Sequence, residues 1–241
     1  MAQESNQEPQ VNLLYLVVVV ASWLAIMEAT PLLNNIFHFR QSSLLSLLAA
    51  LRMTLLLLAT CLYVRLYEKQ RFAAGFRFRF EKIGWNIFWA FLFFIMAIAV
   101  LIPYQSFVVR PLLKHSAEAS MAAPSSALAL KPFFDRFVEF AYVLYEGIIE
   151  VLVFIGFLVD RLARRWNWPR AIIAGNLVFA LWHYRYWEKG LLEGSLMIGL
   201  TSFAGAIISL NYWKTKNTFS SAACHTLVDL PNSIRELLGM L

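Results

Sequence analysis

Long apolar stretches alternate with short polar ones along most of this chain. Runs of about 18–25 mostly apolar residues, a length that suits helices crossing a hydrocarbon core about 30 Å thick, lie near 12–33, 42–66, 85–108, 134–160, 170–187, 190–211 and 218–238. The pattern therefore predicts an all-α polytopic membrane protein, with about seven transmembrane helices in a single bundle. Very short turns separate the last three runs, so these helices are expected to be antiparallel neighbours.

The composition supports a chain built for a lipid environment. Of its 241 residues, 60% are hydrophobic and only 15% are charged, whereas soluble domains carry about 25% charged residues. The net charge of +6 comes from lysines and arginines in short loops between apolar runs, so it does not indicate nucleic-acid binding. No lysine or arginine precedes the first apolar run, which argues against a cleaved signal peptide and for a retained helix.

The basic residues also predict an orientation in the membrane. The loops 65–82, 161–170 and 212–217 together hold twelve lysines and arginines, whereas the alternate loops around 40, 109–131 and 185–189 hold six. Basic loops stay on the cytoplasmic side. The N-terminus is therefore expected in the cytoplasm, with bacterial inner membrane as the expected location.

Three features outside the last helices have simple structural interpretations. The alternation Phe76-Arg77-Phe78-Arg79-Phe80 is typical of an interfacial connector with aromatic anchors, with lipid or substrate docking as the alternative. Arg52 lies inside an apolar run and needs a partner, for which Glu28 is the candidate. The two cysteines, Cys61 and Cys224, lie in apolar runs and imply no disulfide framework.

Ionisable residues inside the later apolar runs are the candidates for chemistry. Glu150, His183, His225 and Asp229 lie at estimated depths of roughly 10–20 Å from the cytoplasmic ends of their helices, given a rise of about 1.5 Å per residue. Such groups are costly in a bilayer and usually functional. Two carboxylates and two imidazoles at compatible depths predict a site that activates water.

A structural role and a metal site are the alternatives for these four residues. Buried polar groups also hold helices together through hydrogen bonds. Zinc could take the same carboxylates and imidazoles, but the HExxH signature of metalloproteases is absent. No metal or other cofactor is therefore expected.

At these residues the chain resembles the CPBP intramembrane proteases, which include the type II CAAX prenyl endopeptidases and bacteriocin-processing relatives. Members carry EExxxR, often as EExxFRG, then FxxxH, then HxxxN or HxxxD. The second motif is present as Phe179 to His183, and the third as His225 to Asp229. The resemblance covers about 134–236 of a single membrane domain, 1–241, in which 1–133 supplies the N-terminal helices and a long loop.

The first motif departs from the family pattern. If Phe154 and Gly156 align with the phenylalanine and glycine of EExxFRG, Glu150 is the first glutamate of the motif. Val151 and Ile155 then replace the second glutamate and the arginine. Replacing both members of a buried ion pair with apolar residues can be neutral, so this is interpreted as a compensated change. Glu146, one turn earlier, is a candidate for the second carboxylate or a packing acid.

The resemblance implies an intramembrane glutamic-type endopeptidase. It implies that Glu150 activates a water with help from His183, and that His225 and Asp229 support the oxyanion. Since an ionised aspartate cannot donate a hydrogen bond, Asp229 is expected to orient His225. Supporting residues are expected at Glu146, Phe179 and Asn176.

The expected substrate is a membrane-anchored protein or peptide, and the depth of the site favours entry from the cytoplasmic half without excluding the other side. The alternative is a non-catalytic CPBP-like membrane scaffold or immunity factor, favoured by the altered first motif.

Overall fold

The chain folds into a helical bundle in a computed structural model that describes residues 16–26, 28, 42–113 and 132–238. Among these residues there are helices and connecting turns but no strands. The all-α prediction is therefore confirmed. The expected first and longest loops, around 40 and 115–131, lie outside the described residues.

The apolar runs become the following helices. They are an N-terminal helix Leu16–Ile26, α2 (Ser42–Leu66), α3 (Phe72–Gly75), α4 (Ile83–Tyr104), α6 (Phe133–Glu150), α7 (Asp160–Arg165), α8 (Trp168–Trp182), α9 (Leu191–Thr215) and α10 (Thr218–Leu237). A π-helical segment, Gln105–Val109, extends α4, and a second, Val151–Val159, joins α6 to α7. A 3₁₀ segment, Tyr184–Lys189, follows α8.

Four of the described helical stretches are long and apolar enough to cross a membrane: Leu44–Leu66, Ile83–Leu113, Phe133–Arg165 and Leu191–Thr215. The N-terminal helix and α8 are apolar or mixed but shorter, and α10 is more polar, so the number seven stays a prediction. The segment predicted as one helix over 170–187 ends earlier, because the chain tightens into the 3₁₀ segment after Trp182.

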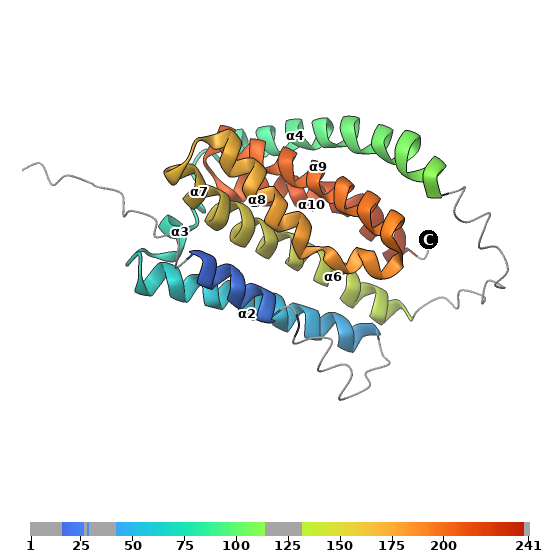
Figure 1. The fold of residues 1–241 in the computed structure, drawn as a ribbon, viewed down its shortest axis with the longest axis horizontal. Coiled ribbons are helices and arrows are strands. Elements are labelled where there is room, and N and C mark those ends of the chain that lie inside the picture. Colours follow the sequence, from blue (N-terminus) through green and yellow to red (C-terminus); the bar gives the residue numbers. More distant parts are fainter. Residues whose placement is uncertain (1–15, 27, 29–41, 114–131, 239–241) are drawn as a thin grey trace, which may run out of the picture.

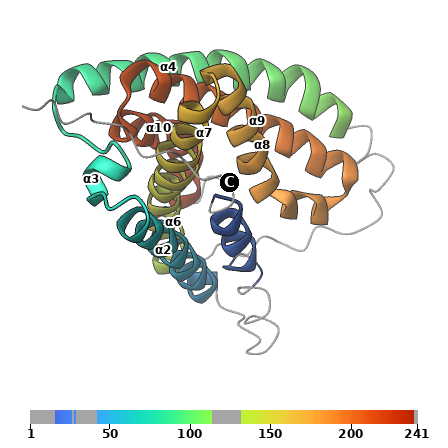
Figure 2. The same cartoon turned by 60° about the vertical axis from the view of Figure 1, so that its left-hand side comes forward.

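The stretch Phe133–Arg165 is the central element of the bundle. In its most apolar window 67% of the residues are buried, against 11% to 22% in the other three candidate spans. It packs between α2 on one side and α10 on the other, while α4 and α9 cover α10. Figures 1 and 2 show α6 between these neighbours.

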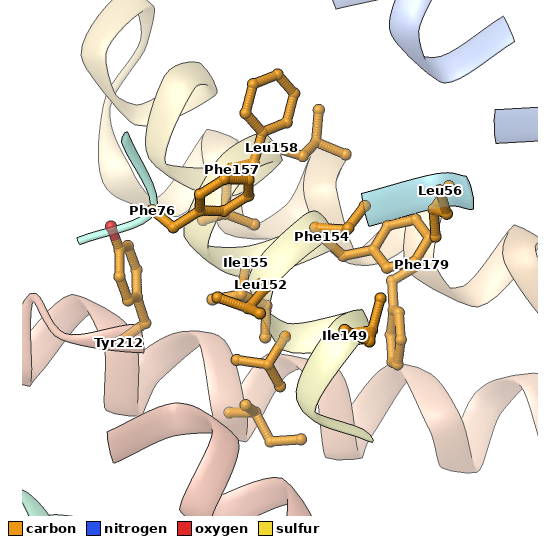
Figure 3. Close-up of a cluster of buried hydrophobic side chains, with 14 of the residues drawn as sticks. Leu56, Phe76, Ile149, Leu152, Phe154, Ile155, Phe157, Leu158, Phe179 and Tyr212 are labelled. Atoms are coloured by element: carbon orange, nitrogen blue, oxygen red, sulfur yellow. The ribbon is translucent and has the colours of Figure 1, made fainter. Parts of the chain in front are cut away.

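Aromatic and aliphatic side chains of the second π-helical segment form the centre of the core. Phe154 and Phe157 pack edge to face against Trp23 of the N-terminal helix, and Phe154 also meets Phe179 of α8. Figure 3 shows Phe154, Phe157 and Phe179 in this cluster of buried side chains. A rigid apolar layer thus lies directly after Glu150 in the sequence and holds the end of α6 in place.

The connector between α2 and α4 is tied into the bundle, and its location at the membrane interface stays a prediction. Phe76 is fully buried, and Arg77 forms an ion pair with the buried Asp160 (2.9 Å). The amide of Asn217 donates to the Arg79 carbonyl (2.8 Å), and the Thr218 amide donates to the Arg77 carbonyl (3.1 Å). Among the phenylalanines of the alternation 76–80, only Phe80, 64% exposed, lies at the surface as an aromatic anchor would.

Candidate active site

Glu150 ends α6 and places a carboxylate between two histidines. Its Oε1 lies 3.6 Å from Nε2 of His183, and its Oε2 lies 4.0 Å from Nε2 of His225. The residue is only 4% exposed, and its Oε1 has no hydrogen-bond partner among the described residues. A buried carboxylate oxygen with free lone pairs is unfavourable unless water or a ligand satisfies it. π-helical turns such as the one that follows are frequent at functional sites.

The end of α8 fixes the ring of His183. The backbone N–H of His183 donates to the Ala180 carbonyl (3.0 Å) as the helix tightens. The ring Nδ1 lies 2.9 Å from the Phe179 carbonyl oxygen, and Tyr186 stacks on the ring at 5.5 Å. Because a carbonyl only accepts, Nδ1 carries the proton of this bond. The opposite nitrogen, Nε2, therefore faces Glu150.

His225 and Asp229 lie one turn apart on α10 and contact each other. Nε2 of His225 is 3.1 Å from Oδ2 of Asp229. His225 is buried, whereas the Asp229 side chain is 34% exposed toward a cavity that it helps to line. The carboxylate therefore lies beside the same ring nitrogen of His225 that faces Glu150.

The three supporting residues have different surroundings. Glu146 lies one turn before Glu150 and accepts a hydrogen bond from the hydroxyl of Tyr142 (2.6 Å). Phe179 packs its ring edge to face against His183 (4.9 Å). Asn176 donates to the Ile172 carbonyl (2.9 Å) and to Ser209 (3.4 Å). Asn176 thus ties α8 to α9 and is not among the residues that line the cavity.

A cavity of about 650 Å³ connects these groups, a size typical of ligand sites. Its inner part contains the four candidate residues with Glu146 and Phe179. Apolar side chains of α4 and α9 form much of the wall, including Ile98, Leu101, Met197 and Leu200. The cavity therefore places ionisable side chains beside an apolar surface.

The altered positions of the first motif leave no unpaired charge. Val151 and Ile155 are 1% and 3% exposed and belong to the apolar core around Phe154. The cavity lining includes Glu146 and Glu150 but neither of these two residues. Their burial fits the interpretation of a paired, compensated replacement.

Arg52 and Glu28 have partners other than each other. The guanidinium of Arg52 lies over the ring of Trp182, 5.6 Å from the ring centroid. Trp182 directly precedes His183 in the sequence. Glu28 accepts a hydrogen bond from the Tyr184 hydroxyl. Among the described ion pairs none joins Arg52 to Glu28, so the expected pairing is wrong. Because cation–π contacts have no sequence signature, the pattern of charges could not have identified Trp182 as the partner.

Sequence reasoning also missed several residues of the site. Tyr142 lies one turn from Glu146, a spacing that could have indicated their contact. Arg110 and Arg235 line the cavity from α4's extension and from α10, but both lie at helix ends, where basic residues are common and carry little signal. In the described part of the chain, no group of three or more His, Cys, Asp and Glu side chains has the arrangement to hold a metal ion.

The helices and the comparisons with known proteins identify the class. The long apolar helices define an integral membrane protein. Residues 133–231, less than half of the chain, match the family model described as type II CAAX prenyl endopeptidase Rce1-like. The resemblance predicted for 134–236 is confirmed by this Rce1-like segment, which at family level supports an intramembrane CAAX-type protease. No curated protein and no solved structure matches the chain.

Proposed function

We propose that this protein is an intramembrane endopeptidase that hydrolyses a peptide bond in a membrane-anchored protein or peptide. The observation that supports this most directly is the buried carboxylate of Glu150, whose Oε1 is without a hydrogen-bond partner among the described residues and faces His183 at 3.6 Å. A water at the apex of this pair donates one hydrogen to each. Glu150 takes a proton from it as general base while the oxygen attacks the peptide carbonyl. When the tetrahedral intermediate collapses, the C–N bond breaks and Glu150 returns this proton to the leaving amine nitrogen.

His183 holds that water in place. With its Nδ1 donating to the Phe179 carbonyl, a neutral ring has its lone pair on Nε2, facing Glu150. The ring therefore accepts from the water and directs its oxygen lone pair toward the substrate. General acid–base and positioning contributions of this kind are worth about 10²–10⁴-fold in rate.

His225 supports the charge that develops during attack. The imidazole contacts Asp229 at 3.1 Å and lies 4.0 Å from Glu150, so its protonated form is stabilised by two carboxylates. A cation fixed beside the attacked carbonyl favours the tetrahedral oxyanion more than the ground state. Asp229 acts through His225 as a positioning residue.

The first test removes the base and the residue that orients the water. Glu150→Ala and His183→Ala should each lower cleavage by about 10²-fold or more, without loss of the folded protein from the membrane. The measurement is a comparison of membrane-protein termini in cells with wild-type and variant protein, followed by cleavage of an identified precursor in vesicles. Glu188→Gln, at an exposed carboxylate, is the matched control and should cleave normally.

Three outcomes would contradict the proposal. If either variant kept wild-type cleavage, Glu150 and His183 would not form the catalytic pair. If the variants left every cellular phenotype of the protein unchanged, the alternative of a non-catalytic scaffold or immunity factor would be favoured. Accumulation of soluble proteins alone, without any membrane anchor, would contradict the substrate class.

The second test concerns the cofactor. A carboxylate can activate water without a metal, so we expect activity to survive strong chelators and the purified protein to hold no stoichiometric zinc. Elemental analysis of the purified protein measures this directly. About one zinc per chain, lost in His225→Ala, would replace the glutamic mechanism by metal-assisted hydrolysis.

A further inference from the structure

A second cavity lies between the end of α2 and α3, away from the candidate active site. Its volume is about 320 Å³. The residues that line it are Cys61, Val64, Arg65, Gln70, Arg71, Phe72 and Phe76, and none of them lines the active-site cavity. Figures 1 and 2 show α3 beside this end of α2. The proposed peptidase gives this second cavity no role.

Close packing of the connector against α2 forms the base of this cavity. Gly75 of α3 contacts Val64 so closely that a Cβ on the glycine would overlap with Cγ1 of the valine. Val64 and Phe76 are buried, and the rings of Phe72 and Phe76 lie 4.9 Å apart. With the half-buried Cys61, these side chains make the base of the cavity apolar.

The rim of the cavity is cationic. Arg65 and Arg71 are exposed, and within the described part of the chain neither guanidinium has a hydrogen bond or an ion pair. Glu68 is the one acidic residue in the sequence from 65 to 75. Both of its oxygens accept from the buried Arg161, at 2.9 and 2.5 Å. The negative charge of Glu68 is therefore compensated inside the bundle, which leaves the positive charge of the rim available to an anion.

The position of the cavity along α2 corresponds to the edge of a bilayer. The apolar stretch Leu44–Leu66 is long enough to cross a membrane. From Cys61 to Leu66 the helix rises roughly 7.5 Å, so the cavity flanks the last turn and a half of this stretch. In a bilayer crossed by α2, the hydrocarbon meets the lipid headgroups at this level. Long basic side chains at such a position extend toward the phosphates.

An exposed apolar face continues from the cavity toward the middle of α2. Leu58 and Leu62 precede Arg65 by seven and three residues, so the three side chains share one face of the helix. The two leucines are 52% and 58% exposed. A soluble anion would leave this face uncovered, whereas an anion that carries acyl chains contacts both the arginines and the leucines.

We propose that this cavity binds one anionic phospholipid, with its phosphate between Arg65 and Arg71 and an acyl chain along Leu58 and Leu62. Guanidinium groups bind phosphate oxygens through paired N–H donors and keep their charge in any protein environment. The basic connector is expected on the cytoplasmic side, where anionic lipids attract basic residues next to membrane-spanning helices. The lipid site does not depend on the proposed function, since it shares no residue with the candidate active site.

The test measures which lipid the full-length protein retains. The protein is purified in detergent with equal amounts of phosphatidylglycerol and phosphatidylcholine that carry the same acyl chains, and native mass spectrometry identifies the lipid that stays bound. The wild type should retain one phosphatidylglycerol in preference to phosphatidylcholine. The combined substitution Arg65→Gln and Arg71→Gln should lower this retention by about 25-fold, at about fivefold for each basic group near the membrane surface.

A matched control removes the same charge elsewhere. Arg79→Gln combined with Arg170→Gln changes two exposed arginines of the basic loops, neither of which lines the cavity, and should retain the lipid as the wild type does. Equal unfolding temperatures in lipid-free detergent show that all variants are folded. Phosphatidylglycerol with a photoactivatable acyl chain should form cross-links at Leu58, Cys61 or Leu62.

Four results would overturn the assignment. Equal retention of both lipids, or of neither, would remove the preference on which it rests. An equal loss of phosphatidylglycerol in the control pair would show a diffuse attraction between the basic loops and the membrane. Cross-links confined to other helices would place the lipid elsewhere. Displacement of the lipid by inorganic phosphate at millimolar concentration would assign the two arginines to a soluble anion.

Discussion

Asp160 shows how much one buried residue can organise in this molecule. Its Oδ1 forms an ion pair with Nε of Arg77 (2.9 Å) and accepts a hydrogen bond from the hydroxyl of Tyr212 (2.8 Å), and its Oδ2 accepts from Arg164 (2.6 Å). These partners belong to the connector before α4, to α9 and to α7. Because the carboxylate is 1% exposed, its desolvation is compensated by these cations and donors together with the buried Arg161, whose Nη1 lies 3.6 Å from Oδ2.

Asp160→Ala should therefore destabilise the protein by about 3–5 kcal/mol, the range for removing one partner of a buried charge cluster. Asp160→Asn, which keeps the shape but loses the charge, should lie between Ala and wild type. Thermal unfolding in detergent micelles measures the shift, with the exposed Glu188→Ala as control. An unfolding temperature of Asp160→Ala equal to that of the control would show that the cluster contributes nothing to stability.

The candidate site was predictable from sequence because its residues are ionisable groups in apolar runs at motif spacing. Glu150, His183, His225 and Asp229 form a chain of contacts between 3.1 and 4.0 Å. Among the partners of Asp160, Arg164 lies at the i,i+4 spacing of a helical ion pair, whereas Arg77 and Tyr212 were not predictable because they come from segments far apart in the chain. The same holds for Arg52, whose partner is the face of an aromatic ring.

At the scale of elements, close contact between the central helix and the start of α10 positions the site. A Cβ on Gly156 would lie 2.6 Å from Oγ1 of Thr218 and 3.1 Å from the Phe76 carbonyl oxygen. Thr218 also donates its hydroxyl to that carbonyl. Only glycine at this position allows the central helix, the connector and α10 to approach this closely. This close approach sets the position of Glu150 relative to His225 along their helices.

Gly156→Ala should therefore lower the free energy of unfolding by about 1–3 kcal/mol through overpacking. It should also reduce cleavage by more than the loss of folded protein accounts for. The matched control is Gly84→Ala in α4, where nothing lies within 4 Å of the added Cβ; there the change should be neutral or stabilising by up to about 1 kcal/mol. Unfolding temperature and precursor cleavage are measured for both. A Gly156→Ala protein as stable and active as Gly84→Ala would contradict the close-contact argument.

Helix positions followed well from the apolar pattern, since the spans predicted at 42–66 and 218–238 agree with α2 and α10 to within a residue. Local changes of helix type could not be predicted from the apolar pattern. The end of α8 at Trp182 and the π-helical segment after Glu150 depend on backbone bonds such as that of His183 to Ala180. A hydrophobicity pattern with a period near 3.6 residues does not contain this information.

At the scale of the whole molecule, the orientation of the bundle in the membrane decides from which side substrate reaches the site, because the cavity extends toward one end of the bundle only. Large apolar side chains of α2 and α4 are exposed, including Leu58, Phe88 and Phe91, as expected for surfaces in contact with lipid. No residue of the basic loops 65–82, 161–170 and 212–217 lines the cavity, so these loops lie at the end of the bundle that the cavity does not reach. If those connectors are cytoplasmic, the cavity mouth faces the opposite side, rather than the cytoplasmic half that the depth of the site suggested.

This orientation can be measured with single cysteines. In a background with Cys61→Ser and Cys224→Ala, Arg71→Cys reports on the basic connector and Glu188→Cys on the 3₁₀ segment at the other end, both at exposed positions. Since basic loops remain inside, a membrane-impermeant maleimide should label Glu188→Cys in intact cells and Arg71→Cys only after permeabilisation. The reverse pattern would place the cavity mouth in the cytoplasm. Substrates would then have to reach the site from within the cell, whereas the expected pattern requires exported or membrane-inserted substrates.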